Sequence, residues 1–136
     1  MVRCLNMRLR LRWSVISVVS LLCGALDYML YRQDTYIGAL SIFPAMPFHW
    51  GYSFFAYYLP DFLWAFSLIF GLFTILSPLH KNTLLCSILT AAYGSLWELG
   101  QFLDWISGTA DWIDVGMYIA ATISAVIIKY IILRRE

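Results

Sequence analysis

Charged residues are scarce in this chain, and their scarcity excludes a soluble fold. Of the 136 residues, 12% are charged and 62% are hydrophobic. A soluble domain of this length cannot bury so much apolar surface. We therefore expect an integral membrane protein.

Cysteine and histidine are also rare, with three cysteines and two histidines. Cys4, Cys23 and Cys86 lack the pair spacing of zinc sites or extracellular disulfides, so we assign them no chemistry. The chain has no Gly-x-Ser-x-Gly motif, phosphate-binding glycine loop or dinucleotide fingerprint. We therefore expect neither a nucleotide cofactor nor a nucleic-acid partner.

Long hydrophobic runs take up most of the sequence. A helix needs about 20 apolar residues to cross a hydrocarbon core of roughly 30 Å. Four runs meet this requirement, at residues 13–31, 59–79, 83–103 and 112–133. The connections after the second and third runs are short, so the last three helices should be sequential antiparallel neighbours. The sequence thus predicts an all-α integral membrane protein, a four-transmembrane-helix bundle that forms a single domain over residues 1–136.

The segment 33–58, between the first two runs, is aromatic but irregular. Pro44 and Pro47 remove backbone donors and interrupt regular helix. Aromatic residues in the second half suit the level of the lipid headgroups: Trp50, Tyr52, Phe54, Phe55, Tyr57 and Tyr58. We expect a long aromatic outer loop that lies on the membrane or re-enters it. A fifth span there would instead put the two ends of the chain on opposite sides.

The basic residues orient the chain. With a cytoplasmic amino terminus, every Lys and Arg except Arg32 lies on the cytoplasmic side or, as Lys129 does, can snorkel towards it. Both termini should then be cytoplasmic. Seven of the eight acidic residues fall on the outer side: Asp27, Asp34, Asp61, Glu98, Asp104, Asp111 and Asp114. The positive-inside rule does not govern acids, so this acidic outer face needs its own explanation.

The first hydrophobic run also resembles a secretory signal peptide, with a basic start, an apolar run at 15–22 and small residues at 23–25. The apolar run, however, continues to Tyr31. Leu22 is also not the small residue that a lipoprotein signal places before its cysteine. We expect this segment to be retained as a helix.

The segment 97–118, WELGQFLDWISGTADWIDVGMY, carries the densest polar pattern. Glu98, Gln101 and Trp105 are three and four residues apart, so they share one face of the third helix, with Asp104 off that face. Glu98 lies about a turn below the outer end of an apolar helix, and an ionised carboxylate in the membrane costs about 2.5–3.5 kcal/mol on insertion scales. We expect Glu98 to face the other helices, either in a functional site or as a protonated or Gln-paired lock between helices.

Asp111 and Asp114 begin the last helix. Asp111 stands at the N-cap, where capping alone, worth about 1 kcal/mol, explains it as well as a functional role does. Asp114 lies further in, where the helix dipole favours it, and we favour a functional role because the cap needs no second carboxylate. Asp61 either initiates the second helix or joins the site. Asp27 should pair with Arg32 near the surface.

Carboxylates from all four helices can converge on one water-accessible pocket under the outer headgroups. The catalytic candidates are Glu98, Asp111 and Asp114, and the ligand-binding candidates are Gln101, Asp61, Asp104 and Asp27. Oxygen ligands without a Cys or His cluster suit a hard cation, Mg²⁺, Ca²⁺ or Mn²⁺, which Glu98, Asp111 and Asp114 would hold. The same group suits proton transfer equally well, because a partly desolvated carboxylate can act as a general acid or base.

The pattern E-x-x-Q at 98–101 and G-T-x-D-x-x-D at 108–114 resembles the carboxyl-terminal signature of the VanZ-like family of small bacterial membrane proteins. In that family a Glu and a Gln late in one helix precede a polar turn and an Asp that opens the next helix. Glu98, Gln101 and Asp114 match these positions. The resemblance implies an envelope role at the outer face of a bacterial cytoplasmic membrane, on a lipid-linked or cell-wall species.

Three functions fit these residues. The first is binding or modification of a membrane lipid or envelope species at the outer carboxylate site, with Gln101 orienting the ligand. The second is a non-catalytic subunit or binding module that packs against a membrane protein partner. The third, cation or proton-linked transport, would need polar groups across the whole membrane, and the cytoplasmic half of 59–79 is nearly all apolar.

Overall fold

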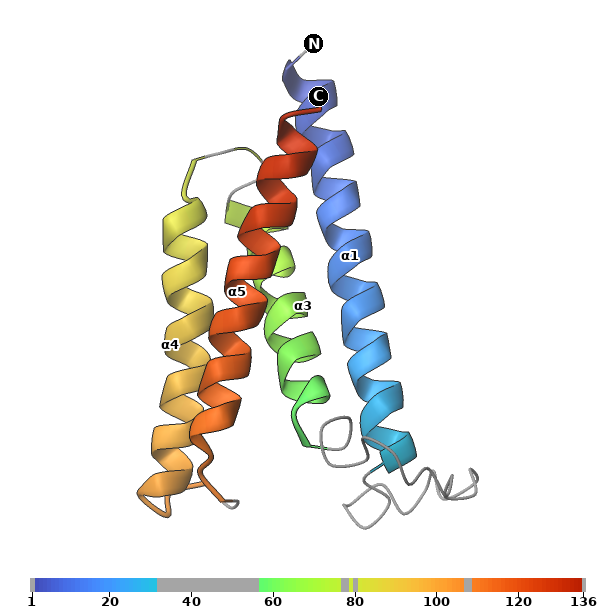
Figure 1. The fold of residues 1–136 in the computed structure, drawn as a ribbon. Helices are drawn as coiled ribbons and strands as arrows, with labels where there is room; N and C mark the ends of the chain where they lie inside the picture. The colour runs from blue at the N-terminus through green and yellow to red at the C-terminus, as the bar shows by residue number, and fades with distance from the viewer. Residues whose placement is uncertain (1, 32–56, 77–78, 80, 107–108, 136) are drawn as a thin grey trace.

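A computed structural model describes residues 2–31, 57–76, 79, 81–106 and 109–135. The fold of these residues is all-helical: α1 (Val2–Tyr31), α3 (Leu59–Leu76), α4 (Thr83–Phe102) and α5 (Trp112–Leu133) (Figure 1). Helices α3, α4 and α5 begin at the predicted residues, whereas α1 begins well before residue 13. The predicted aromatic loop, 33–58, lies outside the described residues except for Tyr57 and Tyr58.

Three of the helices contain a stretch long and apolar enough to cross a membrane. These stretches are Met7–Tyr28 in α1, Leu59–Leu76 in α3 and Trp112–Leu133 in α5. They indicate a membrane protein. Helix α4 is not among them and carries Glu98 and Gln101 near its end.

The buried and exposed faces of α4 also differ from those of a helix in a soluble protein. Its buried residues are small or polar, and all but Gly100 recur every three or four positions: Thr83, Cys86, Thr90, Gly94 and Glu98. Its large apolar residues point outwards, and Leu84 is 74% exposed. Small residues let helices approach closely in lipid, where large apolar side chains gain little by being buried.

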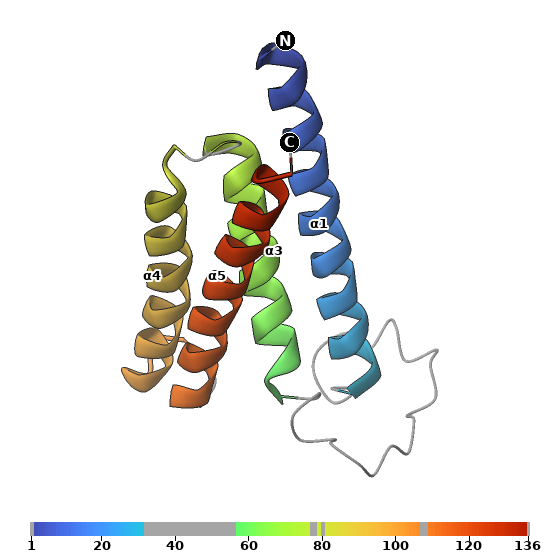
Figure 2. The same cartoon turned by 45° about the horizontal axis from the view of Figure 1, so that its top comes forward.

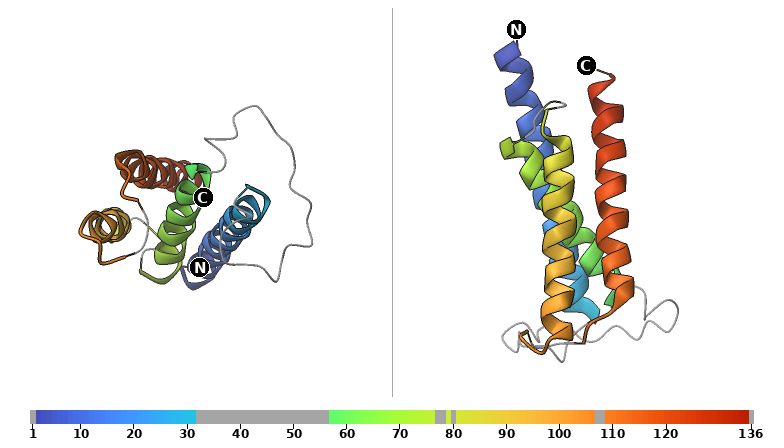
Figure 3. Two further views of the ribbon diagram at one scale, coloured as in Figure 1. Left: turned by 90° about the horizontal axis from the view of Figure 1, so that it is seen from below. Right: turned by 90° about the vertical axis from the view of Figure 1, so that its left-hand side faces the viewer.

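Helix α3 lies in the middle of the arrangement, with α1 on one side and α4 and α5 on the other (Figure 3). Within the described part of the chain, α1 contacts α3 alone, while α3, α4 and α5 all contact one another. Both termini lie at one end of the molecule (Figures 1 and 2). The start of α3, the end of α4 and the start of α5 meet at the opposite end.

An aromatic cluster joins α1 to α3. The ring of Trp13 lies 5.6 Å from that of Phe70 and 6.4 Å from that of Phe73, between ring centroids. Ser17 and Ser67 reinforce this contact, because each hydroxyl donates to the backbone carbonyl of the other residue at 2.8 Å. These contacts hold α1 in register against α3.

Lys129 is buried inside the helices, although the sequence predicted that it would snorkel. Its side chain is 0% exposed. The Nζ atom donates to Thr83 Oγ1 at 2.9 Å and lies 4.0 Å from the centroid of the Phe73 ring. Near the carboxyl-terminal end of α5, the Thr83 hydroxyl and the Phe73 ring therefore take the place of the lipid headgroups that a snorkelling Lys129 would contact.

Lys129→Met and Lys129→Ala should separate the charge of this residue from its volume. Replacing a buried charge by an apolar side chain of similar size is often neutral or stabilising, so the Met variant should keep the parent stability. The Ala variant leaves a cavity and should lose about 2–4 kcal/mol. The free energy of unfolding in mixed detergent micelles measures both. Equal losses in the two variants would show that the ammonium group itself stabilises the fold.

Candidate functional site

A group of polar side chains surrounds Glu98 at the end of the molecule opposite the termini. Glu98 lies in the last turns of α4 and is 6% exposed. Asp61 lies in the first turn of α3, and Asp111 immediately precedes α5. Three helix ends therefore bring carboxylates together from positions far apart in the sequence.

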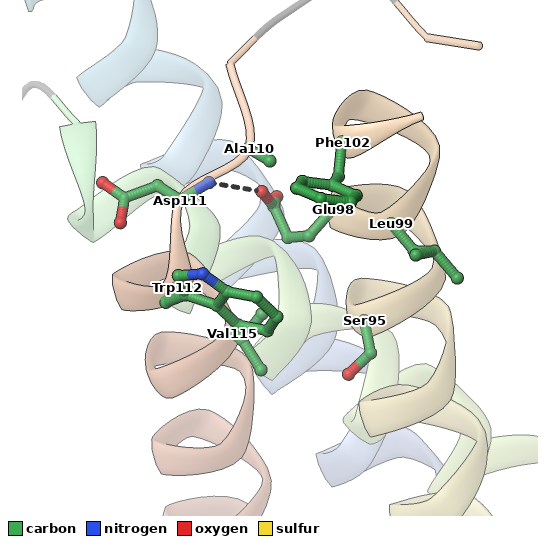
Figure 4. A pocket seen from close by; sticks show the side chains of 8 residues that line it. All are labelled: Ser95, Glu98, Leu99, Phe102, Ala110, Asp111, Trp112 and Val115. Atoms are coloured by element: carbon green, nitrogen blue, oxygen red, sulfur yellow. Dashed lines mark hydrogen bonds between the residues drawn. The ribbon is translucent and has the colours of Figure 1, made fainter. Parts of the chain in front are cut away.

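Both carboxylate oxygens of Glu98 accept hydrogen bonds. Oε2 accepts from the backbone N–H of Asp111 at 3.0 Å (Figure 4), and Oε1 accepts from the hydroxyl of Tyr118 at 3.3 Å. With its amide nitrogen turned towards Glu98, Gln101 donates to Oε2 and to the carbonyl of Thr109, both at 3.2 Å. Its oxygen then accepts from Trp97 Nε1 at 3.2 Å. The pairing of Gln101 with Glu98 follows from their shared helix face.

Tyr118 is the residue that sequence reasoning missed. Its buried hydroxyl lies 3.3 Å from Glu98 Oε1 and 3.3 Å from Asp61 Oδ1, so it bridges α4 to α3. A phenol has one hydrogen to donate, so it satisfies one carboxylate at a time. The available sequence signal was its position one helical turn after Asp114, on the same face of α5.

Gly94 makes room for the Tyr118 ring. A Cβ atom built at Gly94 would overlap Cγ and Cδ2 of that ring. Gly94 is buried on the inner stripe of α4, one turn before Glu98. The absence of a side chain here lets the ring lie against the α4 backbone and places its hydroxyl beside Glu98.

Asp111 caps α5, as its position predicted. With φ −129° and ψ 124°, its side chain accepts from the backbone N–H of Ile113 at 2.9 Å. Glu98 accepts from the N-cap backbone N–H, a role that an acidic residue in the first turn fills in an ordinary capping box. The second carboxylate oxygen of Asp111 accepts from the hydroxyl of Tyr58 at 3.4 Å. Burial, together with the charges of Asp111 and Asp114, raises the pKa of Tyr58.

The other three candidates differ in their placement. Asp114 is half-buried in the first turn of α5, next to the Glu98 group. Asp104 is exposed in the turn after α4, with φ 55°. Asp27 is half-buried on α1, which contacts α3 alone, and among the described residues its Oδ2 has no hydrogen-bond partner. Its predicted partner, Arg32, lies outside those residues.

A divalent cation and proton transfer are the two alternatives for these carboxylates. No group of three or more His, Cys, Asp or Glu side chains within the described ranges is arranged to hold a metal ion. Glu98 and Asp111 direct oxygens to donors instead, namely backbone N–H groups and the hydroxyls of Tyr118 and Tyr58. Hydrogen bonds thus organise these two carboxylates among the described residues.

Two cavities flank the group of Glu98, Asp61 and Tyr118, which we call the Tyr118 network. One, of 310 Å³, lies between α4 and α5 (Figure 4) and is lined by Ser95, Glu98, Leu99, Phe102, Ala110, Asp111, Trp112 and Val115. The other, of 550 Å³, is lined by residues of all four helices: Leu21, Asp61, Trp64, Ala65, Ser67, Leu68, Thr90, Tyr93, Gly94, Trp97 and Tyr118. Glu98 thus lines one cavity, and its hydrogen-bond partner Tyr118 lines the other.

No family model matches this chain, and comparisons with curated proteins and with solved structures give no match either. The function is therefore argued from the geometry of the Tyr118 network and of the two cavities beside it.

Proposed function

We propose that this chain is a four-span membrane protein that binds a lipid or a lipid-linked envelope species at the Tyr118 network. One observation carries the proposal: the Tyr118 hydroxyl joins Asp61 of α3 to Glu98 of α4, and Glu98 lines one cavity while Asp61 and Tyr118 line another. The resemblance to the VanZ-like family agrees with an envelope role. In this proposal α4 is the fourth span, with its large apolar residues towards lipid.

The charge distribution supports an outer position for the network. Arg8, Arg10 and Arg12 lie in the first part of α1, and Arg134 and Arg135 follow α5. The start of α1 and the end of α5 lie at the end of the molecule that holds both termini, away from the start of α3 and the end of α4 (Figure 1). By the positive-inside rule that end is cytoplasmic. In this orientation the expected loop 33–58 is an outer one, and Tyr58, at its end, donates to Asp111.

The shape and lining of the cavities support an amphiphilic ligand. Volumes of 310 and 550 Å³ fall in the range of small-molecule sites. Most lining side chains are apolar. At the end of the molecule opposite the termini, Glu98 and Asp111 line the smaller cavity and Asp61 lines the larger one. A lipid would place its apolar part between the helices and its polar part at the carboxylates. Because Tyr118 can donate and the carboxylates accept, the same atoms could exchange a proton with that ligand.

Native mass spectrometry of protein transferred from nanodiscs of total bacterial lipid tests the proposal. The parent should retain one lipid molecule, and Glu98→Gln and Asp61→Asn should weaken its binding by about tenfold or more, equivalent to about 1.4 kcal/mol. Asp104→Asn is the matched control, since Asp104 is exposed and Asn tolerates its positive φ.

Equal retention in all four proteins, or no retained lipid in the parent, would contradict the proposal. A stoichiometric protein partner in the same preparation, without bound lipid, would favour the alternative that the chain is a subunit of a larger membrane complex. Thermal unfolding of each variant in detergent shows whether it is folded before its binding is compared.

A further inference from the structure

We infer that the 550 Å³ cavity binds the ammonium group of a lipid, held between the Asp61 carboxylate and the rings of Trp64, Tyr93 and Trp97. The inference rests on the proposed function and specifies the class of ligand for that site. The lipid class is one with a primary or quaternary ammonium headgroup.

Aromatic rings line this cavity from two helices. Trp64 belongs to α3, and Tyr93 and Trp97 belong to α4. Tyr93 and Trp97 are one helical turn apart, with ring centroids separated by 6.5 Å and planes tilted by 32°. Aromatic faces attract cations, and several rings around one site are the usual means by which proteins bind quaternary ammonium groups.

Contacts with α1 hold the Trp64 ring in position at this cavity. The ring of Trp64 packs on Tyr28 of α1, with centroids 5.7 Å apart. Gly24 of α1 passes so close that an added Cβ would lie 2.6 Å from Trp64 Cδ1. Because the ring is held in position, little side-chain entropy is lost when a ligand binds against it.

The charge at this cavity favours a cationic group. Asp61 lines it, Glu98 lies one hydroxyl away through Tyr118, and its lining includes no Lys or Arg among the described residues. Attraction between unlike charges strengthens as the surroundings become less polar. An anionic headgroup without an amine would instead meet the Asp61 carboxylate and be repelled.

The length of the cavity matches a lipid rather than a small soluble amine. Its lining residues extend from Asp61 to Leu68 on α3 and from Trp97 to Thr90 on α4. At 1.5 Å per residue each stretch covers about 10 Å along its helix. With the ammonium group at Asp61, the rest of the cavity takes the first part of an acyl chain, beside Leu21 and Leu68.

Titration of the detergent-purified protein with lipids of identical acyl chains tests this inference. Phosphatidylethanolamine and phosphatidylcholine should bind about tenfold more tightly than phosphatidylglycerol. Asp61→Asn should abolish this preference, and Trp64→Leu should reduce it several-fold. Trp105→Leu is the matched control, because Trp105 is 80% exposed and lines neither cavity. Tyr93→Leu, at a ring that is 60% exposed, repeats the test should Trp64→Leu fail to fold.

The outcomes separate this inference from the proposed function. Equal or tighter binding of phosphatidylglycerol would overturn the ammonium assignment and leave a lipid site. Free choline that binds as tightly as phosphatidylcholine would overturn the lipid source of the ammonium group. No binding of any lipid would overturn both the inference and the proposed function.

Discussion

Gly94→Ala is expected to force the Tyr118 ring out of its position against α4 and to break the bridge between Asp61 and Glu98. The new Cβ would overlap ring atoms rather than the far end of a flexible side chain. Overpacking of this kind costs about 1–3 kcal/mol, and losing a buried hydrogen bond costs about 1–3 kcal/mol more. The gain in helix propensity, about 1 kcal/mol, does not offset these losses.

Gly116→Ala is the matched control for this variant. Gly116 lies in the exposed part of α5, and an added Cβ there meets nothing within 4 Å. The control should therefore be as stable as the parent or more stable by up to about 1 kcal/mol. Unfolding in mixed micelles compares the two variants. Equal stability of Gly94→Ala and Gly116→Ala would show that the Tyr118 ring does not occupy the space beside Gly94.

A double variant identifies the cause of the loss. Adding Tyr118→Leu to Gly94→Ala removes the ring that the methyl group meets, so part of the lost stability should return. Lipid binding should be weaker than in the parent protein, because the double variant lacks the hydroxyl that bridges Asp61 and Glu98. Recovery of binding without the hydroxyl would contradict a role of Tyr118 in the site.

The helices could be read from the sequence because each hydrophobic run is long and bounded by turn or charged residues. The start of α1 could not, because the prediction followed hydropathy and stopped at the arginines. In the structure the helix continues past them, and Leu9 and Trp13 are buried against α3. Packing between helices therefore begins before the run at 13–31 that hydropathy predicted.

The local part of the site was predictable, and its long-range part was not. Spacing on one helix brought Gln101 to Glu98, and the short turn before α5 brought Asp111 to the same carboxylate. The contact of Tyr118 with both carboxylates depends on the register of α5 against α3 and α4. Hydropathy and spacing carry no information on that register.

Two of the candidate acids illustrate the same limit. Asp104 was grouped with its neighbours in sequence, but the backbone turns at that residue, with φ 55°, and leaves the side chain exposed. Asp27 was assigned to the same outer end, yet α1 contacts α3 alone within the described part of the chain. For Asp104 and Asp27 the position along the chain was predictable, whereas the direction in which the side chain faces was not.

Glu98→Gln and Glu98→Ala together should show whether this carboxylate serves a ligand or locks the helices. The Ala variant leaves the Asp111 N–H without its acceptor, whereas Tyr118 can still donate to Asp61 and Gln101 to the Thr109 carbonyl. An unsatisfied buried N–H costs about 1–3 kcal/mol and the truncated side chain leaves a cavity, so a loss of about 2 kcal/mol or more is expected.

The Gln variant can keep most of these bonds. Its oxygen accepts from the Asp111 N–H, its nitrogen donates to the Tyr118 oxygen, and Tyr118 then donates to Asp61. We expect its free energy of unfolding to stay within about 1 kcal/mol of the parent, because a buried charge is removed while hydrogen bonds are retained. Lipid binding should nevertheless weaken by about tenfold or more. Stability that falls as far in Gln as in Ala, with lipid binding unchanged, would make Glu98 a structural lock, because then the charge would serve the helices and not a ligand.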